Sequence, residues 1–223
     1  MTMFEWIDDL DQMPALLHCS HRKQGNSNNA VGLFQRGMMQ AGGGEGSVLQ
    51  MRKLDIKPCK ACGICERDTR NFCLFDGKDF ARDVFSYLLK TPFVFIASPI
   101  YFYHLPSRFK TLIDRSQLIW AMKERGVPEV VNAPKRPAYV TLFAGREKGD
   151  KLFEGALLTL KYFLASFNFE MVDPLCFRGM ERIAALESDL GAAGEILKLG
   201  KRAWETHAAG LAEAGKDAAK AEG

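Results

Sequence analysis

The sequence predicts an α/β fold in which helices cover both faces of a five-stranded parallel sheet. Apolar residues make up 47% and charged residues 26% of the 223 residues, a composition typical of a soluble globular chain that can bury its own core. Five short apolar segments alternate along the chain with segments of helical spacing. Such alternation favours right-handed crossovers between parallel strands, and therefore a doubly wound sheet.

The expected strands are short apolar runs, of which FVFIA at residues 93–97 is the clearest. The second strand alternates only weakly, and Pro174 is expected to break the fifth. The five expected strands are residues 15–19, 47–54, 93–97, 138–143 and 169–177.

The segments between the strands have helical spacing, and the first of them ends at three consecutive glycines, residues 42–44. We expect one domain over residues 1–207, followed by an Ala/Lys/Glu-rich tail at 208–223 that is frayed or disordered. The expected helices are residues 28–40, 79–89, 107–123, 151–167 and, as one or two helices, 181–207.

Charge and hydropathy exclude several classes of partner. Thirty Lys and Arg against 27 Asp and Glu leave a net charge of +3, too small to indicate binding to nucleic acid or to an anionic membrane. The longest apolar stretch, residues 93–100, is far shorter than the ~20 residues of a transmembrane helix. The acidic N-terminus lacks the features of a signal peptide, so we expect a cytoplasmic protein.

Four of the six cysteines fall within residues 58–75 with the spacing C-x2-C-x2-C-x7-C. In a reducing compartment such a group is more typical of metal binding or catalysis than of disulfides. Bacterial ferredoxins use the x2 spacing to hold three corners of an iron–sulfur cubane and take the fourth ligand from elsewhere. The first three cysteines fit that pattern, and Cys73 is the nearest fourth ligand, with Cys19 and Cys176 more distant. The proposed ligands are Cys59, Cys62, Cys65 and Cys73.

Two other interpretations of the cysteines remain open. Structural zinc usually takes two C-x2-C pairs separated by a longer loop, which this run fits poorly. The thiols could also be inert, or a single C-x2-C could form a thiol–disulfide pair. The spacing favours an iron–sulfur cluster over both.

Two of the loops expected at the carboxyl ends of the strands could bind one ligand. Residues 20–27 offer Ser20, Arg22, Asn26 and Ser27 beside a helix N-terminus, which is an anion site unless the segment is only a capped loop. Its spacing is neither that of a P-loop nor the dinucleotide fingerprint, which disfavours ATP and a Rossmann-type NAD site. The second loop, residues 99–104, is aromatic and could stack on a planar ligand or contact a protein partner. A phosphorylated planar cofactor such as FMN meets both requirements.

Three segments together, SHRKQGNSN, SPIYFYHLPSRFKTLIDR and KPCKACGICERDTRNFC, resemble the NAD(P)H-dependent FMN reductase-like branch of the flavodoxin-like flavoproteins. The cysteines resemble more narrowly those of iron–sulfur flavoproteins of anaerobic microbes. The resemblance covers residues 14–150. It implies a flavodoxin-like sheet of order 2-1-3-4-5, with a cysteine-rich segment, residues 57–76, inserted after the second strand.

The resemblance also implies which residues contact the cofactor. The family's phosphate loop is matched in order by Ser20, Arg22, Gly25, Asn26 and Ser27, while Cys19 and His21 replace a glycine and a proline. Its K-x-x-x-D-R helix is matched by Lys110, Asp114 and Arg115. The flavin would rest against residues 99–103, with Gly145 at its other edge. The full set of expected FMN contacts is Ser20, Arg22, Asn26, Ser27, Asn28, Pro99, Ile100, Tyr101, Phe102, Tyr103, His104 and Gly145.

The resemblance implies an FMN-dependent oxidoreductase whose [4Fe-4S] cluster passes single electrons to or from FMN. Ferredoxin or NAD(P)H would be the electron donor, and a quinone or an oxygen species the acceptor. The protein would form a homodimer or homotetramer, and no acid–base side chain is required. Because the cysteine segment follows the second strand, we expect it at the same edge of the sheet as the flavin.

Two other functions remain open. One is a flavin-only NAD(P)H:quinone or FMN reductase whose cysteines hold zinc or nothing. The other is a non-enzymatic flavodoxin-like electron carrier, against which the balance of charge argues because such carriers are normally acidic.

Overall fold

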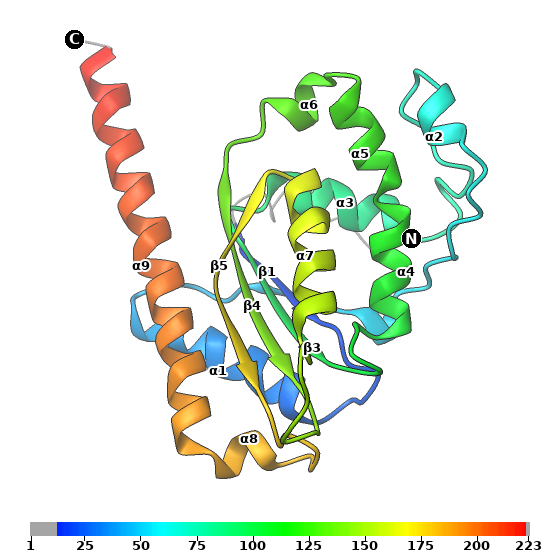
Figure 1. Ribbon diagram of the computed structural model, residues 1–223. Coiled ribbons are helices and arrows are strands. Elements are labelled where there is room, and N and C mark those ends of the chain that lie inside the picture. The colour runs from blue at the N-terminus through cyan, green and yellow to red at the C-terminus, as the bar shows by residue number, and fades with distance from the viewer. Residues whose placement is uncertain (1–12, 222–223) are drawn as a thin grey trace.

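The structure, a computed structural model, describes residues 13–221, with side chains through Lys216; the acidic N-terminal segment lies outside the described residues. Five parallel strands form one sheet of order β2-β1-β3-β4-β5, so the expected order is confirmed (Figure 1). This is the flavodoxin-like order, with its switch point between β1 and β3. The strands are β1 (Ala15–His18), β2 (Ser47–Gln50), β3 (Val94–Pro99), β4 (Arg136–Phe143) and β5 (Phe169–Phe177).

The side chains of each inner strand alternate between two cores, one on each face of the sheet. Leu17, Ile96 and Val140 face one core, which also contains Phe109 from α4 (Ser107–Arg115). Leu16, Phe95 and Tyr139 face the other core, where the ring of Phe34 stacks on that of Phe95. Both faces are therefore apolar and covered, as the continuous apolar strands predict.

One face of the sheet carries α1 (Asn26–Gln40), α8 (Ala185–Ser188) and α9 (Leu190–Ala221), and the other carries the remaining long helices (Figure 1). A short 3-10 helix, Met51–Lys53, follows β2. The remaining helices are α2 (Ile64–Arg67), α3 (Ala81–Lys90), α4, α5 (Gln117–Glu124), α6 (Pro128–Val131) and α7 (Glu154–Ser166).

The helix expected over residues 107–123 is two helices, because the chain breaks regular spacing at Ser116. The N–H of Ser116 donates to the carbonyls of Leu112 and Ile113, at 3.2 and 3.0 Å, and its hydroxyl donates to Ile113 at 2.7 Å. A serine hydroxyl that bonds to the preceding turn competes with the helical ladder. As a result α4 ends at Arg115, whose side chain faces the cysteine segment.

The fifth strand is not broken at Pro174 as expected. It continues through a bulge, since Tyr139 pairs with Val172 but Thr141 pairs with Leu175, and Asp173 takes a φ of 40°. β5 is an edge strand, where a proline without an N–H is tolerated.

The frayed tail expected from Ala208 is helical in the structure. α9 continues to Ala221, and the side chains of residues 208–216 are exposed. Alanine, lysine and glutamate are strong helix formers, so the composition that we interpreted as disorder also favours an exposed helix.

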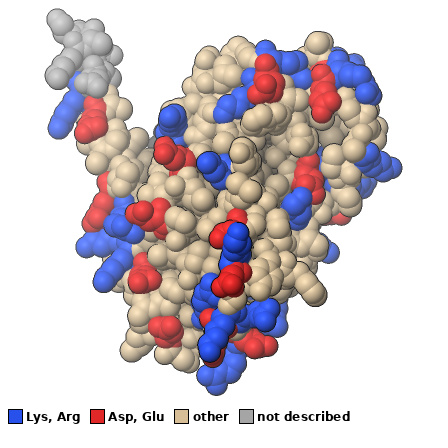
Figure 2. Space-filling view, in the orientation of Figure 1, with Lys and Arg blue, Asp and Glu red and all other residues tan. Residues whose placement is uncertain are grey.

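The charged surface is mixed. Figure 2 shows Lys and Arg interspersed with Asp and Glu over the visible face, in line with the net charge of +3. Within residues 13–221, no helix has both the length and the apolar character needed to cross a membrane.

Candidate functional site

A cavity of about 430 Å³ opens at the carboxyl ends of β1, β3 and β4, where a doubly wound sheet binds its ligands. It brings together the two loops that the sequence singled out, although they are separated by some seventy residues of chain. Its walls are formed by Ser20, Arg22, Gly25, Asn26, Ser27, Pro99, Ile100, Tyr101, Phe102, Phe143, Gly145, Arg146, Met180, Glu181 and Ile183.

One end of the cavity is suited to an anion because α1 begins there. Gly25 precedes the helix with a φ of 142°, a conformation that favours glycine, and the first turn contains no acidic residue. No described side chain caps this helix, and its first residues, Asn26 and Ser27, line the cavity, so the first N–H groups of α1 lie at this end of the cavity without a side-chain cap. The Ser20 hydroxyl accepts the N–H of Arg22 at 3.1 Å, which holds the loop beside the helix end. This end of the cavity can therefore hold a phosphate.

Asn26 lines the cavity, but its side-chain amide is hydrogen-bonded to residues of the cavity wall and of α8. Its amide nitrogen donates to the carbonyls of Met180 and Arg182, at 2.8 and 3.1 Å, and its amide oxygen accepts the N–H of Leu186 at 3.1 Å. Both N–H bonds of this amide are therefore used within the protein. Asn28, also expected at the site, lies exposed on α1 and lines a neighbouring groove with α8 and α9 instead.

The aromatic loop is a tight turn at the cavity rim. Tyr101 and His104 exchange two backbone hydrogen bonds of 2.9 and 3.0 Å, and the two residues between them, Phe102 and Tyr103, have φ values of 48° and 63°. This is the pattern of a type I′ turn, which normally takes Asn-Gly. Bulky residues there are strained, and strain of this kind gathers at functional sites. The turn leaves the ring of Phe102 fully exposed at the rim.

His104 does not face the cavity. Its Nδ1 accepts the N–H of Leu105 at 2.9 Å, so Nε2 carries the proton and donates to the Thr159 hydroxyl at 3.1 Å. The imidazole therefore fastens the turn to α7. Tyr103 lines a smaller adjoining cavity, where its hydroxyl accepts a hydrogen bond from Arg146 at 3.3 Å.

Sequence reasoning missed the wall that follows β5. Met180 donates its N–H to Ala144 at 2.9 Å, and Gly179 donates to Arg146 at 3.3 Å, so this loop is clamped onto the loop after β4. A Cβ added to Gly145 would lie 3.3 Å from the Cβ of Glu181, so the two loops approach closely here. The position of this loop in the chain could have predicted that it lines the cavity, because the carboxyl end of the fifth strand lies at the same edge of the sheet as those of β1, β3 and β4. The lining residues absent from the expected set are Gly25, Phe143, Arg146, Met180, Glu181 and Ile183.

The four clustered cysteines line a second cavity, of about 380 Å³. Cys59 and Cys62 are exposed, Cys65 and Cys73 are half-buried, and all four are free thiols. Burial raises the pKa of Cys65, and the neighbouring charges of Glu66, Cys73 and Cys59 raise it further. Four thiols of this kind can ligate an iron–sulfur cluster or a structural zinc ion. Among the described residues, no group of three or more His, Cys, Asp or Glu is arranged to hold a single metal ion.

The second cavity does not lie at the carboxyl edge of the sheet, where we expected it. The segment leaves β2 at that edge, but its cavity is walled by Arg115, Gln117 and Leu118 at the junction of α4 and α5. Figure 1 shows α2 beside α5, away from the loops that end β3 and β4. The nine residues of α4, roughly 13 Å of helix, separate the aromatic loop from Arg115. Within the described chain, the two cavities share no lining residue.

Comparison with known proteins agrees with this architecture. Over 65 residues the chain is 35% identical to the iron-sulfur flavoprotein of Methanosarcina thermophila; the match covers 29% of this chain and 32%, about a third, of that protein. The fold is similar to that of RosB with the bound intermediate 8-demethyl-8-formylriboflavin-5′-phosphate, with a TM-score of 0.64 and 15% identity over 95% of this chain and 88% of that one. It is also similar to NAD(P)H:quinone oxidoreductase from Methanothermobacter marburgensis, with a TM-score of 0.57 and 14% identity over 86% and 96% of the two chains.

The chain matches a protein family over most of the sheet, the loop at the start of α1 and the aromatic loop. Residues 15–150 match the family described as NADPH-dependent FMN reductase. This range contains the loop at the start of α1, the aromatic turn and the cysteine segment. Because it spans more than half of the chain, the resemblance inferred from the motifs is confirmed: the chain belongs to the NADPH-dependent FMN reductase family.

Proposed function

We propose that this chain is an FMN-dependent reductase in which residues 57–76, inserted between β2 and α3 of a single domain spanning 1–207, hold a [4Fe-4S] cluster. The cluster would pass single electrons to or from the flavin. The observation that carries the proposal is that all four clustered cysteines line one cavity. The similarity over 65 residues to an iron–sulfur flavoprotein supports it.

In the proposed flavin site the chain's own residues bind and orient the cofactor. The first N–H groups of α1, with Ser20 and Arg22, would hold the phosphate, since a helix N-terminus and a guanidinium both favour an anion. The wall formed by Pro99 and Ile100, with Gly145 opposite, would take the ring. Bound FMN supplies both one-electron and two-electron redox chemistry.

We propose partners that can reach the open cavity at the carboxyl ends of the strands. NAD(P)H or ferredoxin would be the electron donor, and a small molecule such as a quinone or an oxygen species the acceptor. The exposed ring of Phe102 at the rim gives such a planar molecule a surface for stacking. We further propose a cytoplasmic homodimer or homotetramer in which a neighbouring subunit closes the site.

The proposal is tested by the iron, sulfide and FMN content of protein purified without oxygen. We expect four irons, four sulfides and one FMN per chain. Cys62→Ala should lose the iron and keep the FMN, because Cys62 lines only the second cavity. Cys176→Ala is the matched control, since this thiol lies on β5 outside both cavities, and it should keep both groups.

FMN without iron or sulfide in the wild-type protein would contradict the cluster and leave a flavin-only reductase. Zinc in place of iron would indicate a structural metal site. Iron that survives Cys62→Ala would exclude Cys62 as a ligand.

A further inference from the structure

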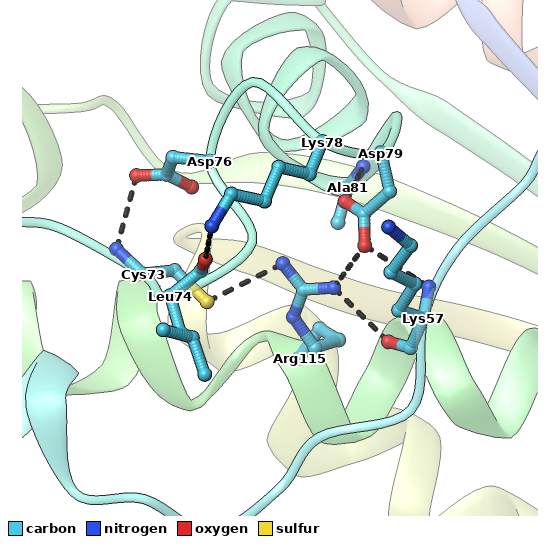
Figure 3. A network of polar contacts seen from close by, with 8 residues as sticks. All are labelled: Lys57, Cys73, Leu74, Asp76, Lys78, Asp79, Ala81 and Arg115. Carbon is cyan, nitrogen blue, oxygen red and sulfur yellow. Dashed lines mark hydrogen bonds and ion pairs between the residues drawn. The ribbon is translucent and has the colours of Figure 1, made fainter.

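One buried guanidinium closes the cysteine segment at both of its ends (Figure 3). Arg115, the last residue of α4, forms an ion pair with Asp79, which precedes α3, and the two side chains are only 2% and 1% exposed. The same guanidinium nitrogen, Nη1, donates to the carbonyl of Lys57 at 3.0 Å, just before the first cysteine. The other, Nη2, donates to Sγ of Cys73, the last cysteine, at 3.3 Å.

Asp79 fixes the guanidinium and the backbone around it. Its Oδ2 also accepts the N–H of Lys57 at 3.0 Å, and its Oδ1 accepts the N–H of Ala81 at 3.1 Å, at the start of α3. Phe75 covers the guanidinium, with 4.9 Å between Cζ and the ring centroid. Asp79, the Lys57 carbonyl and the Phe75 ring therefore fix the orientation of the Arg115 guanidinium. Its Nη2 faces the Cys73 thiol.

A buried ion pair is weak evidence for stability, because taking both charges out of water costs about what their attraction returns. Here the Arg115 Nε, also buried, has no hydrogen-bond partner among the described side chains and backbone. A buried polar group left in this way calls for a reason other than packing. The contact with the Cys73 sulfur supplies such a reason, because through it the Arg115 guanidinium reaches the cavity.

We propose that Arg115 is a positioning residue for Cys73: it holds the thiol at the cavity wall and donates a hydrogen bond to its sulfur. The proposal rests on the proposed function, because the sulfur matters to redox chemistry only if a cluster binds. Its structural part, closure of the segment by Arg115, holds with or without a cluster. Lysine cannot replace this arginine, because one ammonium cannot reach Asp79, the Lys57 carbonyl and Cys73 as a rigid fork does.

The test compares Arg115→Lys with Arg125→Lys. Arg125 is a matched control because it also holds the cysteine segment, donating to the Cys65 carbonyl at 2.7 Å and to the Asn71 side chain at 2.9 Å, but its bonds go to oxygen rather than sulfur. Two quantities are measured. One is amide hydrogen exchange of residues 71–79 in protein stripped of iron. The other is the midpoint potential and electron paramagnetic resonance spectrum of the iron-loaded protein.

Arg115→Lys should speed exchange over residues 71–79, shift the potential to a more negative value and change the spectrum. The direction follows because a hydrogen bond to a ligand sulfur favours the more negatively charged, reduced state. Arg125→Lys should leave the potential and the spectrum unchanged, which separates loosening of the segment from loss of the sulfur contact.

An Arg115→Lys protein with the wild-type potential and spectrum would overturn the proposal, as would unchanged exchange over residues 71–79. A wild-type protein without iron would contradict the proposed function, and faster exchange in Arg115→Lys would then still support the closure by Arg115. If Arg115→Lys does not fold, Arg115→Met combined with Asp79→Asn removes both charges and keeps one acceptor oxygen, which can accept the N–H of Lys57 or of Ala81, and the same outcomes apply.

Discussion

In the proposed flavin site, Arg22 is the residue whose expected contribution to phosphate binding can be isolated most cleanly. Its side chain is exposed at the cavity beside the start of α1. Arg22→Ala should weaken FMN binding by about 10–100-fold, because a hydrogen bond to a charged group is worth about 1.5–3 kcal/mol. Riboflavin, which lacks the phosphate, should bind nearly as before. Fluorescence titration with both flavins measures the difference.

Lys23→Ala is the control for Arg22, since Lys23 is exposed in the same loop but lies outside the cavity wall. It should leave both affinities nearly unchanged. An equal loss of FMN and riboflavin binding in Arg22→Ala would place the effect on the ring or the loop rather than on the phosphate.

His18, at the end of β1, makes folding stability depend on pH. It is 2% exposed, and burial, together with the nearby charge of Arg52, lowers its pKa from the usual 6.5 to about 4. Between these values the unfolded chain binds a proton that the folded chain does not, so stability rises with pH. The contribution is complete above about pH 6.5, and about 3 kcal/mol is lost as the pH falls through the window to 4.

The His18 effect is measured by urea unfolding of the wild-type protein and of His18→Leu from pH 4.5 to 7.5. The wild type should lose more stability than the variant toward low pH, since leucine does not titrate. Parallel pH profiles would mean that other groups carry the dependence.

At the scale of the elements, α1 and α9 cross closely enough to require glycine on both helices. A Cβ on Gly37 would lie 2.1 Å from the Leu197 carbonyl oxygen, and one on Gly200 would lie 2.0 Å from that of Phe34. Gly200→Ala should therefore destabilise the fold by about 1–3 kcal/mol or more, as overpacking does. Urea unfolding measures the change.

Gly194→Ala, on the same helix, is the matched control. An added Cβ there meets no heavy atom within 4 Å, so alanine should be neutral or stabilise by up to about 1 kcal/mol through its helix propensity. Equal effects of the two substitutions would contradict the close crossing.

At the scale of the whole molecule, the two cavities should load independently. They share no lining residue among those described, and α4 separates them. Removing iron with a chelator should change FMN affinity by no more than about two-fold, because distant sites contribute almost additively. Flavin titration before and after chelation checks this. Loss of FMN in parallel with iron would show that the cavities are coupled.

Much of the architecture could be predicted from local patterns. The period of the apolar residues indicated five strands and the helices between them, because that period reports which face of an element is buried. The prediction failed where side chains, rather than periods, decide the local structure. The Ser116 hydroxyl splits one helix, the bulge at Asp173 carries β5 past Pro174, and the tail from Ala208 is helical.

Residues close together in the chain were sufficient to predict the fold, the family, the group of four cysteines and the loop that begins α1. How the side chains are used was not predictable in this way and came from the packing of the folded chain. In the folded chain, the Asn26 side chain is hydrogen-bonded within the cavity wall and His104 is hydrogen-bonded to α7. The loop after β5 lines the cavity, and Arg115 contacts Cys73, 42 residues away. Such contacts depend on how distant elements pack and where their side chains point, and no local spacing records that.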